Sequence, residues 1–232
     1  FCISPPPLKS ETLVIMLSHG GSRRYSLQAL ARTREAGSPT GIVTGIGSEI
    51  ADGAADVVVR TSNRDPSAAF TVSHTSALTA LAMLAVMVGE SDGVAAAADT
   101  RPALDQLHVL TEWTIATEMA VRALAADLSD SRVVVFVGAG PNEATAYEAA
   151  LKTAEASRIP SMGFQAEQFL HGPFVALEPG DAVVALVTHG AERDRILDVV
   201  GAASAAGANT VVLADESDHE AFAIARSGVS LP

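Results

Sequence analysis

Three side chains between residues 148 and 173 have the types and spacing to move protons on a small substrate. Lys152 and Glu155 are three residues apart, so on a helix they share a face and place an ammonium group beside a carboxylate. A carboxylate beside a cation stays ionised and can act as a general base. His171 follows within QFLHGP (168–173), where Pro173 restricts the backbone of the residue before it. The other interpretation is a plain surface ladder, in which Glu148 pairs with Lys152 four residues later.

A second polar set lies in the loop 18–23, between a predicted strand and a predicted helix. Helix N–H groups are unpaired at such a junction, and open α/β sheets bind ligands at the carboxyl ends of their strands. Two glycines allow close approach, the serines supply hydroxyl donors, and the arginines supply positive charge. The alternative is an ordinary turn with a serine as helix N-cap. The residues concerned are Ser18, His19, Gly20, Gly21, Ser22 and Arg23, with Arg24 behind them.

This loop belongs to a stretch that recurs 170 positions later. Residues 11–44 match 181–214 without a gap, so that the strand, the polar loop and the following helix are all repeated. In the second copy, Glu192 and Asp194 replace the hydroxyl groups near the loop. We therefore predict a gene-duplicated protein in which the first loop binds an anion and the second does not.

The elements that must position these residues alternate between strands and helices. Strands are predicted at 12–17, 40–44, 56–60, 133–137 and 182–187, and helices at 23–36, 72–89, 102–128 and 143–157, with a short helical turn near 48–53 and a loop at 158–173. This alternation indicates an α/β fold with parallel sheets. We expect a first domain at 1–100 that lacks its N-terminal portion, a bridging amphipathic helix at 101–130, and a second domain at 131–232 that lacks its C-terminal helix or tail.

Composition restricts the possible ligands. The chain has 27 acidic and 15 basic residues and a net charge of −12, so its field repels nucleic acid and we expect a small-molecule ligand only. The six histidines show no metal spacing, and Gly138-Ala139-Gly140 lacks the third glycine of a dinucleotide fingerprint. We expect no metal and no cofactor.

Composition also restricts the cellular setting. The longest apolar stretch, 77–88, is shorter than the ~20 residues that a membrane-spanning helix needs, which predicts no membrane association. The start of the sequence lacks the pattern of a signal peptide, and a single cysteine, Cys2, cannot form an internal disulfide. These features predict a cytoplasmic protein.

Two motifs resemble a known family. ALKTAEAS at 150–157, with His171-Gly172-Pro173 sixteen residues after the glutamate, is similar to the isomerase half of glucosamine-6-phosphate synthase and its sugar isomerase (SIS) domain relatives. The strand with its Ser18-x-x-Gly21 loop, and VSHT at 72–75, resemble that family's phosphate and sugar loops. The resemblance covers nearly the whole chain. It implies two tandem flavodoxin-like αβα domains and a homodimer.

The resemblance also implies roles for individual residues. Glu155 would move a proton between C1 and C2 of an open-chain sugar phosphate, Lys152 would stand beside it, and His171 would assist ring opening. Loop 18–23 would bind the phosphate, together with Val72, His74 and Thr75 from the second motif.

The sequence departs from the family's pattern in the binding loops. Gly20 stands where the family has a second serine, Arg23 where it has threonine, and His74 where the synthase has serine. The leading hypothesis is an aldose–ketose isomerase, or a deaminase of an amino sugar phosphate, with a glutamate as general base. The altered loop keeps two alternatives open: a non-catalytic sensor of phosphosugars, and a fold that only dimerises around a decayed site.

Overall fold

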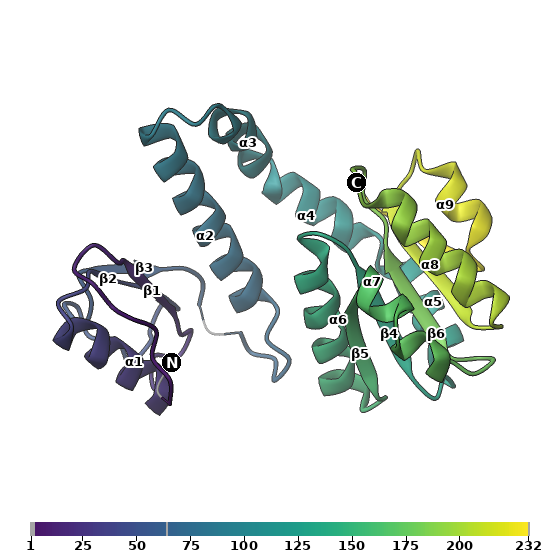
Figure 1. Cartoon of the computed structure of the whole chain (residues 1–232), viewed down its shortest axis with the longest axis horizontal. Helices are drawn as coiled ribbons and strands as arrows, with labels where there is room; N and C mark the ends of the chain where they lie inside the picture. Colours follow the sequence, from purple (N-terminus) through teal and green to yellow (C-terminus); the bar gives the residue numbers. More distant parts are fainter. Residues whose placement is uncertain (1–2, 64, 232) are drawn as a thin grey trace. The chain divides into compact units, whose positions relative to one another are not determined.

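The computed structural model describes residues 3–63 and 65–231 and divides the chain between Gln106 and Leu107 into two compact units (Figure 1). Each unit has a parallel β-sheet of its own, and helices connect the successive strands except β2 and β3, which are joined by turns and bends. The predicted α/β class with parallel sheets is therefore confirmed.

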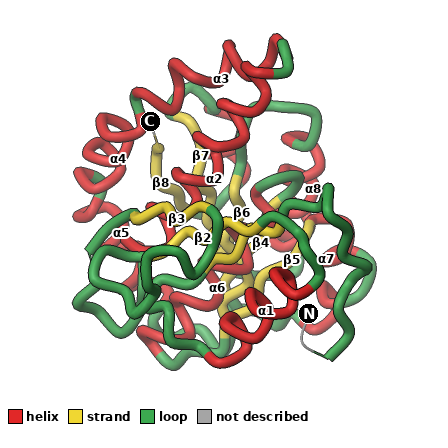
Figure 2. The backbone as a smooth tube through the Cα atoms, turned by 90° about the vertical axis from the view of Figure 1, so that its left-hand side faces the viewer, coloured by secondary structure: helices red, strands yellow, loops and turns green. Residues whose placement is uncertain are grey.

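The first unit is built on a three-stranded sheet in the order β1-β2-β3. The central strand β2 is buried along its whole length, and Ile42 packs with Met16 and Leu30 in a small core. In Figure 2 the yellow tubes of β2 and β3 run side by side, as their parallel pairing requires. The elements are β1 (Val14–Leu17), α1 (Arg24–Glu35), β2 (Thr40–Thr44), β3 (Val57–Arg60), α2 (Val72–Ser91) and α3 (Ala95–Asp105).

The second unit has a five-stranded parallel sheet in the order β5-β4-β6-β7-β8, which is the 2-1-3-4-5 order of flavodoxin-like folds. Val135 and Val137 pack on one side of this sheet with α8, while Val134 and Val184 pack on the other with α5. The elements are α4 (Leu107–Ala116), α5 (Glu118–Leu128), β4 (Val134–Gly138), α6 (Asn142–Ser157), β5 (Ser161–Gln165), α7 (Ala166–Leu170), the 3-10 helix η1 (Pro173–Ala176), β6 (Ala182–Leu186), α8 (Arg193–Ala205), β7 (Asn209–Asp215), α9 (His219–Ile224) and β8 (Ser227–Leu231).

The two sheets correspond only approximately at the offset of the repeat. β1, α1, β2 and β3 have counterparts in β6, α8, β7 and β8. The strand registers differ by one residue, because Val14 pairs with Thr40, whereas Val184 pairs with Val211 and not with Thr210. A common ancestor of the two units therefore stays a prediction.

The predicted bridging helix at 101–130 is wrong. Three helices, α3, α4 and α5, occupy this region, and the alanine run at 95–98 is the start of α3. At the second break the hydroxyl of Thr117 donates to the carbonyl of Thr114 at 2.8 Å, and its N–H bonds the same carbonyl at 3.1 Å. This i to i−3 turn competes with the α-helical ladder. Apolar periodicity showed the helical faces but not where the helices end.

The segment 158–173, predicted as a loop, contains β5 and α7 and ends at the first residue of η1. β5 lies at the edge of its sheet and has Gly163 at its centre, so its sequence lacks the apolar run of a central strand. The helical turn predicted near 48–53 is also wrong, since these residues form turns and bends without a helix.

Helix α2 is longer than the apolar stretch suggested. Its 20 residues, Val72–Ser91, are long and apolar enough to cross a membrane by length and composition, with 11% of its most apolar 18-residue window buried. The argument that 77–88 is too short therefore does not hold for the complete helix.

Candidate functional site

A cavity of about 520 Å³ opens in the first unit where β1 ends and α1 begins. Five of the six residues of loop 18–23 line it, which brings most of the predicted phosphate loop to one place. The lining consists of Leu17, Ser18, His19, Gly20, Ser22, Arg23, Ser26, Ile46, Gly47, Ser48, Glu49 and Phe70.

Loop 18–20 is fixed by the segment that follows β2. The Thr44 hydroxyl donates to the carbonyl of Ser18 at 2.7 Å. The next two carbonyls accept the N–H groups of Gly45 at 2.9 Å and Glu49 at 3.1 Å. Three successive carbonyl oxygens are therefore engaged by residues 44–49, which anchor the loop backbone to the end of β2 and the segment after it.

Two glycines make this close approach possible. Gly21 has a φ of +74°, and a Cβ there would lie 2.6 Å from Cγ1 and 2.9 Å from the backbone nitrogen of Ile50. Gly45 packs against the His19 ring, because a Cβ would lie 2.5 Å from its Cε1. The Nε2 atom of His19 is buried and has no hydrogen-bond partner among the described residues.

The positive charge of the loop is not neutralised by any side chain that the structure describes. Arg23 and Arg24 form no ion pair with any residue that the structure describes, and the first turn of α1 has no acidic residue. Arg23 occupies the N-cap position without a side-chain cap, so Ser22 is not the N-cap. The hydroxyl of Ser22 and the free N–H groups of this turn remain available to an anion.

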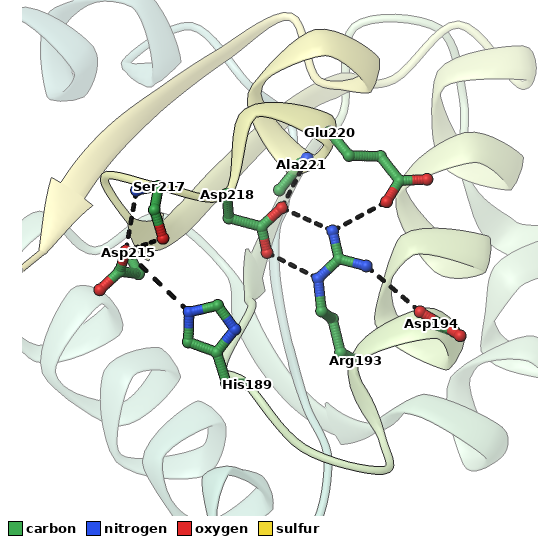
Figure 3. A network of polar contacts seen from close by, with 8 residues as sticks. All are labelled: His189, Arg193, Asp194, Asp215, Ser217, Asp218, Glu220 and Ala221. Carbon is green, nitrogen blue, oxygen red and sulfur yellow. Dashed lines mark hydrogen bonds and ion pairs between the residues drawn. The ribbon is translucent and has the colours of Figure 1, made fainter.

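In the matching loop of the second unit, the arginine is already paired with carboxylates of the protein (Figure 3). Both nitrogens on one side of the Arg193 guanidinium donate to Asp218, at 2.6 and 2.7 Å, and Glu220 lies at 2.9 Å. His189 faces Asp215 with 4.0 Å between nitrogen and oxygen. The hydrogen bonds from Arg193 are the main cause that lowers the pKa of Asp218 to about 2. This guanidinium is already neutralised, which agrees with the predicted loss of anion binding.

The residues at the start of α2 that were predicted to bind the ligand do not line this cavity. Val72, His74 and Thr75 are not among the residues that line the cavity, whereas Phe70 is. The N-terminus of α2 already has an anionic partner, because the buried carboxylate of Asp65 accepts the N–H of Val72 at 2.9 Å and the preceding N–H at 2.8 Å. Backbone donors at this helix end are therefore occupied.

Sequence reasoning missed the lining residues 46–49 and Phe70. Residues 46–49 follow the carboxyl end of β2, which neighbours β1, so adjacency of parallel strand ends could have indicated them. Phe70 precedes α2 in a stretch without a recognisable motif, and the sequence contains no comparable signal for it.

In the second unit, α6 places the predicted cation and carboxylate on one face. The Lys152 Nζ lies 2.7 Å from an oxygen of Glu155 and 3.6 Å from one of Glu148. The three side chains are 22%, 39% and 27% exposed, respectively, so the cluster is open to a ligand. The hydrogen bond to Glu155 is the main cause that raises the pKa of Lys152. This arrangement places an ammonium group directly beside the carboxylate that the sequence nominates as general base.

His171 lies at the end of α7, and its polar partner within the described residues is Glu167. Its Nε2 lies 3.2 Å from a Glu167 oxygen, and Glu167 in turn pairs with Arg195 of α8. No contact joins His171 to Lys152 or Glu155 in the part of the chain that the structure describes. Glu167 and Arg195 were not predicted as site residues. Among the same residues, no group of three His, Cys, Asp or Glu side chains could hold a metal ion.

Residues 127–225 match the SIS domain. The relatives include the glutamine–fructose-6-phosphate aminotransferases (isomerizing) of Thermococcus kodakarensis, 30% identical over 91% of this chain, and of Thermus thermophilus, 27% identical over 98%. The chain spans 36% and 38% of these two relatives. One SIS domain is matched, so the expectation of a second is not confirmed.

Solved structures show the same fold. The C-terminal domain of glucosamine-fructose-6-phosphate aminotransferase from Francisella tularensis superimposes with a TM-score of 0.84 at 18% identity, over 94% of this chain and 63% of that one. Tagatose-6-phosphate ketose/aldose isomerase from Escherichia coli gives a TM-score of 0.69 at 19% identity, over 97% and 62%. Residues 127–225 therefore match the SIS domain, and the chain is similar over nearly its whole length to part of the isomerizing glutamine–fructose-6-phosphate aminotransferases.

Proposed function

We propose that this protein binds a sugar phosphate through loop 18–23 and acts on it as an aldose–ketose isomerase or an amino sugar phosphate deaminase, with Glu155 as the general base. The observation that carries the proposal is the cavity of the first unit, lined by the exposed hydroxyl of Ser22 and by Arg23, which forms no ion pair with a described residue. The contrast with Arg193, which is neutralised by Asp218, supports a specific role for Arg23.

A phosphate group suits this cavity chemically. It offers several acceptor oxygens to the Arg23 guanidinium, the Ser22 hydroxyl and the first N–H groups of α1. The chain as a whole is acidic, so a free local cation is needed to attract an anion. Glu49 lines the same cavity, and its carboxylate can accept hydrogen bonds from sugar hydroxyl or amino groups.

The proposed isomerisation uses the residues of the second unit. In ring opening, the anomeric hydroxyl loses its proton, C1–O5 breaks, and the ring oxygen takes a proton, with His171 transferring one of them. Glu155 then removes the proton from C2 of the aldose and returns it to C1, while a hydroxyl proton passes from O2 to O1, which gives the ketose through an enediol. Lys152, which lies 2.7 Å from a Glu155 oxygen, stabilises the negative charge that develops on the substrate oxygens.

Arg23→Gln tests the phosphate site. Fructose 6-phosphate, glucosamine 6-phosphate and tagatose 6-phosphate are titrated against the protein, with thermal unfolding as the readout. A true ligand at 100-fold its Kd stabilises the wild type by about 2.7 kcal/mol, and this gain should be lost in the variant.

Arg32→Gln is the matched control, since it removes the same charge from the last turn of the same helix. It should retain the stabilisation. If both variants bind equally well, loop 18–23 is not the phosphate site.

Glu155→Gln tests the general base. We expect product formation, followed by mass spectrometry or a coupled assay, to fall by roughly 10²- to 10⁴-fold while ligand binding persists. Glu148→Gln removes the other carboxylate near Lys152 and should have a much smaller effect. Unchanged turnover in Glu155→Gln would exclude this residue from the mechanism.

The altered loop favours one alternative, a non-catalytic phosphosugar sensor. Gly20 and Arg23 replace the family's hydroxyl residues and leave a binding site with different donors. A sensor would be stabilised by a sugar phosphate in the same titration, would lose this effect in Arg23→Gln, and would form no product with any member of the panel.

A further inference from the structure

His171 stands at the end of a line of charged side chains that connects α7 with α8. Its Nε2 lies 3.2 Å from Oε2 of Glu167, one helical turn before it. Both oxygens of Glu167 accept hydrogen bonds from Arg195, Oε1 from Nε and Oε2 from Nη2 at 2.9 Å. Arg195 has a second partner in Asp198, at 3.0 Å. In this arrangement a guanidinium fixes a carboxylate, and the carboxylate in turn can hold the imidazole in one orientation.

We propose that Glu167, fixed by Arg195, is a positioning residue that holds the His171 imidazole with its hydrogen on Nε2 and leaves Nδ1 as the nitrogen that exchanges protons with the substrate. This inference rests on the proposed role of His171 in ring opening. It assigns the reacting nitrogen and two supporting residues.

The chemistry of the carboxylate determines the tautomer. The hydrogen bonds from Arg195 are the main cause that lowers the pKa of Glu167, so this side chain is ionised at neutral pH. An ionised carboxylate can only accept hydrogen bonds. The nitrogen that faces it must therefore be the donor, which leaves the other ring nitrogen with its lone pair free.

The location of Arg195 argues for more than an incidental surface pair. It is the third residue of α8, where the helix macrodipole disfavours a positive charge. A two-point guanidinium–carboxylate contact across elements compensates this position and fixes the carboxylate in direction as well as distance. The Glu167 carboxylate is therefore held in a fixed orientation towards His171.

No other charged group of the neighbouring elements competes for the imidazole among the residues that the structure describes. β4, β5 and η1, which pack against α7, contain no titratable side chain. On α8, Arg193 is bound to Asp218, and Asp194 accepts from Arg193, while Asp198 accepts from Arg195.

The test is ¹⁵N NMR of the imidazole in the complete protein above pH 8, with the His171 signals assigned from His171→Asn. The wild type should show a single tautomer with the hydrogen on Nε2. Glu167→Gln should give a mixture of both tautomers, because an amide can donate as well as accept. Arg195→Lys keeps the charge but loses the two-point contact, and should give an intermediate result. Asp198→Asn, the matched control, should match the wild type.

Kinetics provide the second readout. In Glu167→Gln, kcat for cyclic substrate should fall roughly tenfold or more with little change in KM, and the fall should not exceed that of His171→Asn. Asp198→Asn should retain the wild-type rate. An unchanged tautomer in Glu167→Gln would overturn the positioning role even if the enzyme is active. A changed tautomer in a protein without any turnover would instead contradict the proposed function and leave the positioning intact.

Discussion

Arg23 and Arg193 occupy matching positions in the two loops but have different surroundings. Arg23 forms no ion pair with a described residue, whereas the Arg193 guanidinium is 20% exposed and bound to Asp218. Asp218 is 3% exposed and also accepts the N–H of Ala221 at the start of α9. One buried carboxylate from a neighbouring loop therefore converts a potential anion site into a structural contact.

We predict that Asp218 makes stability dependent on pH at the acidic end. Its pKa falls from 3.8 to about 2 on folding, mainly because of the hydrogen bonds from Arg193. A lowered carboxyl pKa contributes stability above the unfolded value and loses it as the pH falls through the folded value. The free energy of unfolding should decrease by about 2 kcal/mol between about pH 4 and pH 2 from this group alone, as measured by urea titration.

Asp218→Asn should abolish this contribution, because asparagine retains the N-cap acceptor but cannot be charged. The variant should be less stable than the wild type at pH 7, with the difference shrinking towards pH 2. Asp194→Asn is the control, since Asp194 also contacts Arg193 but is 93% exposed. A difference from wild type that is constant with pH in Asp218→Asn would contradict the prediction.

At the level of elements, helix α6 and strand β5 hold the Lys152–Glu155 pair in place. They meet at Gly163, where a Cβ would lie 2.6 Å from Cα of Tyr147 and 2.7 Å from the carbonyl of Ala146. A side chain at position 163 could be accommodated only if helix α6 moved away from strand β5. This close contact explains why a glycine interrupts β5 and thereby weakens its sequence signal.

Gly163→Ala should therefore displace α6 and lower the free energy of unfolding by about 1–3 kcal/mol, in the range of overpacked cores. We also expect a loss of the turnover that depends on Glu155. Denaturant unfolding and the isomerase assay measure the two effects. Gly201→Ala, in α8 with nothing within 4 Å of its added Cβ, should instead stabilise by about 0.5–1 kcal/mol. Equal effects of the two substitutions would refute the close contact.

At the level of the whole molecule, the two units differ in how much core they contain. The second unit buries residues on both sides of five strands, with Val135 and Val184 on opposite faces. The first unit has three strands and a small core around Ile42. The matched SIS domain lies entirely in the second unit, which is the one with the complete flavodoxin-like strand order.

The sequence by itself determined the α/β class, most strands and helices, the loop 18–23 and the shared face of Lys152 and Glu155. These depend on alternation, apolar periodicity and fixed helical spacing, which are local properties of the chain. Local patterns failed where a contact between distant segments decided the outcome. Strand β5 was not predicted because Gly163, which is needed where helix α6 packs closely, interrupts its apolar pattern. The helix breaks at 106 and 117 were not predicted because they leave the apolar periodicity intact.

Only the tertiary structure decided which polar residues meet. It placed Phe70 and residues 46–49 beside loop 18–23, left Val72, His74 and Thr75 outside the lining of that cavity, and joined His171 to Glu167 and Arg195. It also left Arg23 without an ion pair among the described residues, while Asp218 neutralises Arg193. The physical reason is that hydrogen bonds and ion pairs act over a few ångströms in space, between side chains that folding brings together from separate parts of the sequence.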